Sequence, residues 1–182
     1  MGFAEQNLMR STARPDPRLE TSAEFASWFA GSKAVDSAGR PRVLYHGTTS
    51  SFDAFDPAKV GTRHLDWELG PAFYFTTSTK SASAYATSLW SSPDGKTPAP
   101  NACVMPCFLR MNNPLIEDVE EQPAFDWIPL LIERAKKNGR DGVIAIDVDD
   151  GVIDTQYVVF SPERIRSIYS FATTILEKDL AR

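Results

Sequence analysis

The sequence VLYHGTT at residues 43–49 is an apolar run that ends in His46 and is followed at once by Gly47. We therefore predict a strand over residues 43–46, with His46 at the point where backbone pairing stops and a side chain can face a ligand. Gly47 lets the backbone approach another group closely and offers that group its N–H and C=O. A histidine packed beside a turn glycine has the same sequence, so both interpretations stay open at this stage.

Outward from this stretch, strands and helices alternate along the chain. Apolar and β-branched runs predict further strands at residues 72–76, 104–110, 143–148, 156–160 and 165–171. Apolar residues at helical spacing predict helices at residues 21–31, 79–90 and 123–138. Strands interleaved with three helices, with several antiparallel connections, indicate an α+β fold.

Four local signals refine the prediction of these elements. Thr21 and Glu24 form a capping-box pattern at the start of the first helix. Pro129 weakens or kinks the last helix, and Asp150-Gly151 is a hairpin-turn signal. Residues 91–100 are dense in turn formers and are expected to form a surface loop inside one domain.

Length and composition indicate one globular domain. The chain has 182 residues, 42% hydrophobic and 24% charged, and a net charge of −5, which argues against a generic nucleic-acid or membrane-surface binder. Residues 1–20 are expected to be a flexible lead-in, and residues 21–182 a single domain. The lead-in lacks the apolar core of a Sec signal peptide, so we expect a cytoplasmic protein or one delivered into a target cell by another route.

Neither the cysteines nor the acidic residues point to a metal site. Cys103 and Cys107 either form a disulfide with each other or stay reduced. A zinc site would need both cysteines and the only two histidines, and their spacing in the sequence matches no zinc motif. The acidic run at residues 147–150 does not fit the EF-hand template and is interpreted as hairpin-turn chemistry. We expect no metal.

Three polar positions are further candidates for a binding site. Tyr74 faces away from its neighbours Phe73 and Phe75 on the predicted strand, and Tyr85 follows in the next helix. Two tyrosines brought together can sandwich a flat aromatic ligand, although both can equally be core aromatics. Gln156 leads an otherwise apolar strand, which marks either a site or a strand that begins at the surface.

Three stretches follow one another along the chain: LYHGT at residues 44–48, FYF at 73–75 with Lys80-Ser81-Ala82 and Tyr85, and QYVVF at 156–160. In this order they resemble the ADP-ribosyltransferases of the poly(ADP-ribose) polymerase and diphtheria-toxin type, which carry a His-Tyr-Glu triad on three strands. Four further patterns are WFAGSKAVD at residues 28–36, FDAFDP at 52–57, NGRDGV at 138–143 and Y-V-V-F-x-P-x-x-I at 157–165. With them the chain resembles more closely the ADP-ribosyltransferase domains of phage polyvalent proteins and related bacterial toxins.

The resemblance covers about residues 25–168 and implies an ADP-ribosyltransferase-like split β-sandwich core flanked by helices. It implies NAD as substrate, with His46 bonding a ribose hydroxyl and Gly47 holding the nicotinamide amide through its backbone. Thr48 belongs to the same motif and is counted with the cofactor-binding residues.

The two tyrosines and a helix serine receive roles in the same way. Tyr74 and Tyr85 match the tyrosines that sandwich the nicotinamide ring. Ser81 is matched with a serine that also bonds the amide, although ungapped spacing puts Ala82 there. Residues 59–70 match the loop that covers the donor.

The main departure from the family pattern is Gln156, where many members have glutamate. An amide keeps the hydrogen bond to the ribose but lacks the negative charge that stabilises positive charge at the anomeric carbon. We therefore expect mono-ADP-ribosyl transfer rather than polymer synthesis. The missing charge is assigned as a hypothesis to Asp154, or to Glu68 or Asp66 of the covering loop. A second departure is Pro71-Ala72, where the family usually has a glycine two residues before the tyrosine.

The resemblance thus implies His46, Tyr74 and Gln156 as catalytic residues of a mono-ADP-ribosyltransferase. Its expected acceptor is a protein, with a nucleic-acid acceptor as the alternative, and its expected role is that of a toxin or effector with an immunity partner and no membrane partner. The rivals are a weakly active NAD- or ADP-ribose-binding module and an NAD glycohydrolase. An Arg-Ser-Glu enzyme using Arg42 is disfavoured, because Gln156-Tyr157-Val158 lacks the required acidic pair.

Overall fold

The computed structural model describes residues 22–52, 54–59, 72–88 and 96–168. In chain order these residues form α3 (Ala23–Phe29), β1 (Leu44–Thr48), η1 (Pro57–Lys59), β2 (Phe73–Thr76), α4 (Thr79–Ala86), β3 (Cys103–Leu109), β4 (Leu115–Asp118), α5 (Ala124–Lys137), β5 (Gly142–Asp149), β6 (Ile153–Val159), η4 (Pro162–Arg164) and β7 (Ile165–Ser167). The predicted α+β class is confirmed. The predicted lead-in and residues 60–70 of the predicted covering loop lie outside the described residues.

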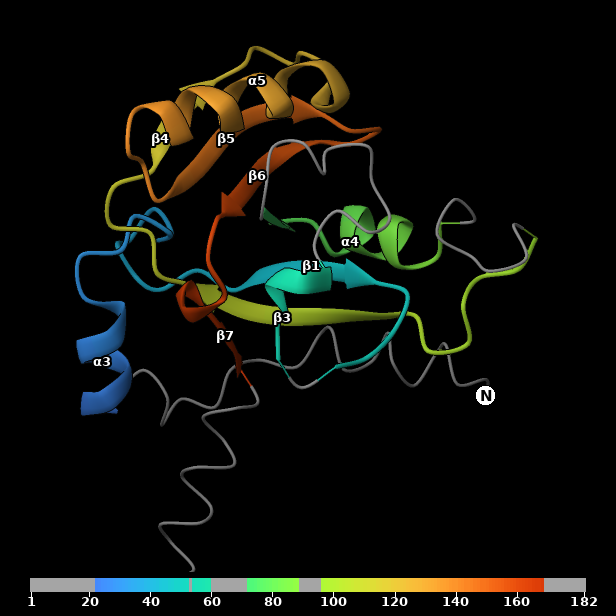
Figure 1. Cartoon of the computed structure of the whole chain (residues 1–182), viewed down its shortest axis with the longest axis horizontal. Helices are drawn as coiled ribbons and strands as arrows, with labels where there is room; N and C mark the ends of the chain where they lie inside the picture. Colours follow the sequence, from blue (N-terminus) through green and yellow to red (C-terminus); the bar gives the residue numbers. More distant parts are fainter. Residues whose placement is uncertain (1–21, 53, 60–71, 89–95, 169–182) are drawn as a thin grey trace, which may run out of the picture.

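The seven described strands form one sheet that is nearly divided in two. Their order is β4-β5-β6-β2-β1-β3-β7. Between β2 and β1 the register consists of the single pair Tyr45↔Thr76, whereas β1 and β3 are paired along five residues. The sheet therefore has two leaves, β4-β5-β6-β2 and β1-β3-β7, which separate beyond this pair as the split-core expectation requires (Figure 1).

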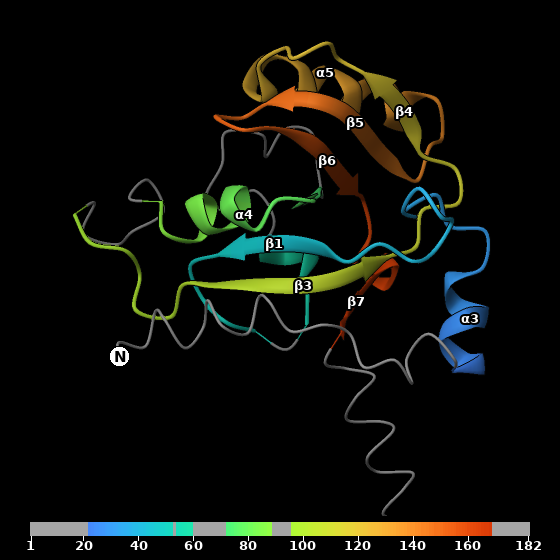
Figure 2. The same ribbon diagram turned by 180° about the vertical axis from the view of Figure 1, so that it is seen from behind.

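Helices cover the two leaves separately. The apolar side of α5 packs on β5 of the first leaf, and α4 packs on β1 and β3 of the second. Figure 2 shows the same arrangement from behind, with α3 at the end of the second leaf. Because α4 sits beside the line where the leaves part, it brings its side chains to that line.

Alternation along β2 and β6 gives the first leaf two different faces. Phe73 and Phe75 lie in a buried cluster with Tyr157 and Val159, and their strand neighbours point to the opposite face. Residues directly opposite each other in a ladder share a face, so the pairs Tyr74↔Val158 and Thr76↔Gln156 lie on that second face. The predicted opposition of Tyr74 to its phenylalanine neighbours is thereby confirmed.

Some element boundaries differ from the sequence-based expectations. The N-cap of α3 is Ser22, one residue beyond the expected Thr21, and α4 ends at Ala86 rather than at residue 90. The four-residue strand β4 was not predicted, because it is too short for a clear alternation. Pro129 lies inside α5 without ending it.

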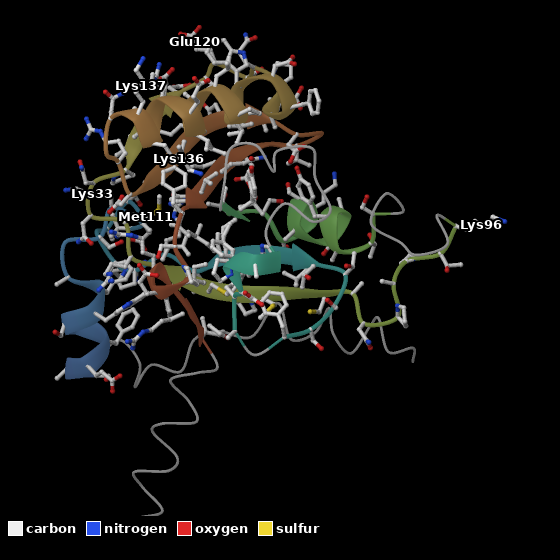
Figure 3. The ribbon with its side chains drawn as sticks, in the orientation of Figure 1. Lys33, Lys96, Met111, Glu120, Lys136 and Lys137 are labelled. Atoms are coloured by element: carbon white, nitrogen blue, oxygen red, sulfur yellow. The ribbon has the colours of Figure 1, made fainter. Side chains whose placement is uncertain are left out.

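The loop after α3 is tied to the far end of β3. Gly31 has φ +75, the left-handed conformation expected of the residue that follows a helix. Ser32 Oγ donates to the carbonyl of Leu109 at 2.8 Å and accepts from the N–H of Met111 at 3.0 Å. The N–H of Lys33 donates to the Met111 carbonyl at 2.6 Å, and Figure 3 shows these two residues side by side.

The two cysteines do not pair with each other. Cys103 and Cys107 both lie in β3, four positions apart, which along a strand is about 13 Å, beyond the reach of a disulfide. Cys107 is buried, and this burial raises the pKa of its thiol. Within the described ranges, no helix has the length and apolar character needed to traverse a bilayer.

Candidate functional site

His46 occupies the line where the two leaves separate. Its Nδ1 lies 2.8 Å from the carbonyl oxygen of Tyr74 on β2, so the imidazole links the strands where their backbone ladder has ended. The ring packs among Phe52, Phe55 and Phe75, with centroids 5.2–6.2 Å away. The predicted strand end at His46 is wrong, because β1 continues to Thr48 through its pairing with β3; what ends beside His46 is the pairing with β2.

The contact with Tyr74 sets the tautomer of His46. A carbonyl only accepts hydrogen bonds, so Nδ1 carries the proton and donates it, which leaves Nε2 as an acceptor in the neutral ring. Burial among aromatic rings lowers the pKa of His46 below the ordinary 6.5, against a smaller opposing effect of the Tyr74 carbonyl. At neutral pH, His46 therefore presents Nε2 as a hydrogen-bond acceptor.

We expect His46 to titrate below pH 6.5 in the folded protein and to keep its proton on Nδ1 when neutral. Because the unfolded chain binds a proton at this ring near pH 6.5, the His46 contribution to stability is complete above that pH. It is lost as the pH falls below it. Ring nitrogen and carbon NMR shifts measured against pH test this, since the chain has only two histidines and His64→Ala identifies the other signal. A His46 pKa at or above 6.5 would contradict the expectation.

Helix α4 passes very close to Gly47. A Cβ at this position would lie 1.9 Å from the carbonyl oxygen of Ala82 and 3.0 Å from the nitrogen of Ala86. The close approach inferred from the sequence is therefore an approach of α4, which only a residue without a side chain permits.

The backbone groups of Gly47 point toward the gap between the leaves. Tyr45 is paired with Pro106, which has no N–H, so this cannot be a hydrogen-bonded pair and Tyr45 directs its backbone groups away from β3. Alternate residues of a strand point the same way, so Gly47 also directs its N–H and C=O to the side of β2. There the register with β2 is limited to Tyr45, so β2 does not pair with Gly47.

Helix α4 begins beside this gap and is anchored by Asp154. The Asp154 carboxylate accepts hydrogen bonds from the hydroxyls of Thr76 and Thr77 and from the N–H of Ser78 at 2.9 Å. Ser78 in turn caps the helix, its Oγ accepting from the N–H of Ser81 at 3.1 Å. Asp154 thus fixes the start of α4.

Ser81 carries an unsatisfied polar atom into the site. Its side chain is buried, and its Oγ has no hydrogen-bond partner among the described residues. A buried hydroxyl without a partner is costly, so such atoms in folded proteins often await a ligand or water. This supports the role that the resemblance implies for Ser81.

Tyr85 and Gln156 are joined by a third residue, Asp150. The Tyr85 hydroxyl donates to Asp150 Oδ2 at 2.5 Å, and Gln156 Nε2 donates to the same oxygen at 2.9 Å. Burial, followed by the bond to Asp150, the Asp150 charge and the nearby Tyr74, raises the pKa of Tyr85. The two tyrosines and Gln156 therefore lie together, with one carboxylate between them.

Asp150 is the site residue that the sequence reasoning missed. It was assigned to turn chemistry, and it does lie in the hairpin between β5 and β6, where Asp149 Oδ1 accepts from the N–H of Gly151. In β5 a bulge between Ala145 and Val148 adds a residue to the hairpin, which increases the local twist. The dipeptide signal identified the turn but contained no information about where its side chains point.

The remaining predicted site residues either bond elsewhere or lie outside the described residues. Of the carboxylates proposed to compensate for Gln156, Asp154 holds α4, and Glu68 and Asp66 lie outside the described residues. The Thr48 hydroxyl donates to the Ser50 carbonyl at 3.0 Å and so closes its own turn.

Arg42, the residue of the disfavoured Arg-Ser-Glu interpretation, lies near Tyr157 on β6, where burial raises the pKa of the tyrosine and the charge of Arg42 opposes that rise. Successive residues of a strand point to opposite faces, so Tyr157 lies on the face away from Gln156. Arg42 is thus directed away from the side of the sheet that carries Gln156.

Comparison with known proteins gives one family. A family model described as "ADP-Ribosyltransferase in polyvalent proteins" matches residues 36–128, slightly more than half of the chain. This span includes His46, Gly47, Tyr74, Ser81 and Tyr85 and ends before Gln156. No curated protein matches the chain. Among the described residues, no group of three or more His, Cys, Asp or Glu side chains is arranged to hold a metal ion.

Proposed function

Because the chain belongs to the family of ADP-ribosyltransferase domains in polyvalent proteins, we propose that it transfers one ADP-ribose unit from NAD to a protein acceptor and releases nicotinamide. The observation that carries the proposal is the convergence of candidate residues from four separate elements. His46 of β1 bonds the backbone of Tyr74 on β2, and Tyr85 of α4 meets Gln156 of β6 through Asp150.

The groups at the gap fit a nicotinamide amide. An amide both donates and accepts hydrogen bonds, and Gly47 directs a backbone N–H and C=O to the same side of β1. The unpartnered Oγ of Ser81 adds one more polar group from α4. Tyr85 is 43% exposed as a residue, which leaves part of it accessible to a flat ligand.

The reaction separates charge at the ribose. When the bond between the nicotinamide nitrogen and ribose C1′ breaks, its electron pair stays with nicotinamide, which leaves as a neutral molecule. C1′ then carries positive charge until a lone pair of the acceptor forms the new bond, and the acceptor's proton passes to solvent. A site that stabilises this charge accelerates the reaction, and fixed dipoles and charges are the usual means.

Gln156 and the net charge support the finer parts of the proposal. The amide at position 156 accepts a hydrogen bond but cannot take the proton of a further ADP-ribose hydroxyl, even with a charge beside it, which favours a single transfer. The net charge of −5 disfavours DNA as acceptor. We further propose a toxin or effector role, in which the acceptor is a protein of a target cell.

Nicotinamide release from NAD, followed by NMR with and without a cell lysate, tests the function. We expect release that requires lysate, together with a lysate protein that gains the mass of one ADP-ribose unit. Release that is equally fast without lysate would instead indicate a glycohydrolase. NAD binding without release would indicate a binding module and would overturn the transferase proposal.

We expect Ser81→Ala to weaken NAD binding while leaving the free protein as stable as before or slightly more stable. The variant removes a buried hydroxyl that lacks a partner in the free protein, so folding loses no hydrogen bond. If the hydroxyl bonds NAD, the loss of about 1 kcal/mol corresponds to a fivefold to tenfold weaker affinity. Calorimetric titration with NAD and urea unfolding measure the two quantities. Ser83→Ala, on the same helix, is the control, and equal NAD affinity in both variants would contradict the assignment.

A further inference from the structure

One carboxylate oxygen holds together two of the residues that we propose to bind NAD. Asp150 Oδ2 accepts from the Tyr85 hydroxyl at 2.5 Å and from Gln156 Nε2 at 2.9 Å. Tyr85 and Asp150 are 65 positions apart in the chain, so the contact exists only because the β5–β6 hairpin folds over α4. A turn needs no such contact, since Asp149 already bonds the N–H of Gly151.

This contact determines which end of the Gln156 amide is available. A carboxylate only accepts hydrogen bonds, so the NH₂ end of the amide must face Asp150 and the carbonyl end must face away. The side chain is 9% exposed, and no described residue donates to its Oε1. Gln156 therefore presents an acceptor oxygen, as a glutamate would.

We propose that Asp150 is a positioning residue that makes Gln156 work as a glutamate in ADP-ribosyl transfer, Gln156 supplying the oxygen that accepts a ribose hydroxyl and Asp150 supplying the negative charge. The inference rests on the proposed function and concerns the same site. It assigns the charge to Asp150, and not to Asp154, whose carboxylate is occupied by Thr76, Thr77 and Ser78.

The physical basis is polarisation through a short hydrogen-bonded chain. A negative charge beside the NH₂ of an amide draws positive charge toward that end and leaves more negative charge on the carbonyl oxygen. Positive charge developing on the ribose is then stabilised by both the amide oxygen and the nearby carboxylate. The Tyr85 hydroxyl, whose pKa is raised by burial and then by Asp150, stays protonated and donates to the same carboxylate.

A purely structural role for Asp150 is the alternative, since the carboxylate also braces the hairpin against α4. The two roles differ in what the charge does. Asp150→Asn keeps the size of the side chain and an acceptor oxygen for Tyr85, but removes the charge. We expect this variant to release nicotinamide about 100-fold more slowly, the size of effect seen when one preorganised electrostatic contact is removed.

Moving the negative charge from position 150 to position 156 should restore the activity that Asp150→Asn loses. In Asp150→Asn/Gln156→Glu the carboxylate stands directly at the proposed ribose contact, and we expect activity within about tenfold of the native chain. In Gln156→Glu alone, two carboxylates meet where the native structure has a 2.9 Å contact, so the pKa of the introduced carboxyl rises and activity gains a new pH dependence. Asp149→Asn, on the same hairpin, is the matched control and should retain native activity.

The experiment is nicotinamide release by these variants across pH 5–9, with the pKa of the carboxyl introduced at position 156 measured by carbon-13 NMR in the single and double variants. This pKa should be raised in Gln156→Glu and return toward its ordinary value in the double variant. If the native chain is active and Asp150→Asn releases nicotinamide at the same rate, this inference is overturned and the proposed function stands. The same holds if the double variant is folded but releases nicotinamide no faster than Asp150→Asn. A native chain that releases no nicotinamide, whether or not it binds NAD, overturns the proposed function, and this inference with it.

Discussion

Gly47→Ala is expected to displace helix α4 from the sheet and to abolish NAD binding. The added Cβ would lie 1.9 Å from a backbone oxygen of α4, the carbonyl oxygen of Ala82, which cannot rotate away as a side-chain atom can. The helix must shift, and it carries Ser81 and Tyr85 with it. Overpacking of this kind costs about 2–4 kcal/mol, a large share of the stability of an ordinary domain.

Gly39→Ala is the control for this variant. Gly39 lies eight residues before Gly47, but a Cβ at Gly39 would meet nothing within 4 Å. Its φ of +76 still makes the substitution strained, at a cost of about 1 kcal/mol. Urea unfolding and NAD titration of both variants measure the difference. If Gly47→Ala lost no more stability than Gly39→Ala and still bound NAD, the close contact between α4 and β1 would be wrong.

His46→Ala is expected to reduce nicotinamide release about 100-fold. The ring makes one hydrogen bond to Tyr74 and offers Nε2 for another in the complex with NAD. Loss of two hydrogen bonds at about 1.5 kcal/mol each corresponds to roughly two powers of ten in rate. Steady-state release measured at pH 7.5, where His46 is neutral, gives the value.

Two further variants separate the roles of the ring nitrogens. His46→Asn places an amide NH₂ near the position of Nδ1 and so keeps a donor to the Tyr74 carbonyl, but has no counterpart of Nε2. His46→Gln extends an amide toward the position of Nε2. If Nε2 bonds the ribose, the asparagine variant remains folded and is nearly as slow as alanine. Native activity in His46→Asn would show that the ring only ties β1 to β2.

Much of the fold could be predicted from local pattern. The runs that became β1, β2, β3, β5 and β6 were identified as strands from their apolar and β-branched residues, and α5 was placed within one residue at its start and end. The prediction missed β4, whose four residues are too few for a clear alternation. It placed the N-cap of α3 one residue early, because Thr21 and Ser22 both carry a hydroxyl that can cap a helix. Alternation also placed Tyr74 opposite its phenylalanine neighbours, because the period of two is a property of the strand itself.

The sequence predicted several residues of the site but not the hydrogen bonds between them. His46 and Gly47 were singled out by their position after a strand, and Tyr85 and Gln156 by their residue types together with the family resemblance. Asp154 was expected to compensate for Gln156 because it shares a face with it two residues away. Its carboxylate bonds the start of α4 instead, a contact across 76–78 positions that no local spacing reveals.

The sequence by itself determined the class of the fold, the family and the residue types at the gap, because periodicity, turn signals and motif order are local and are read along the chain. Only the tertiary structure decided what Gly47 approaches and which carboxylate meets Gln156. Both depend on how the β5–β6 hairpin and α4 pack across the line between the two leaves. Such packing is set by the summed burial of side chains that lie far apart in the sequence. The partners of Asp150 follow from this packing and not from the residues next to Asp150 in the sequence.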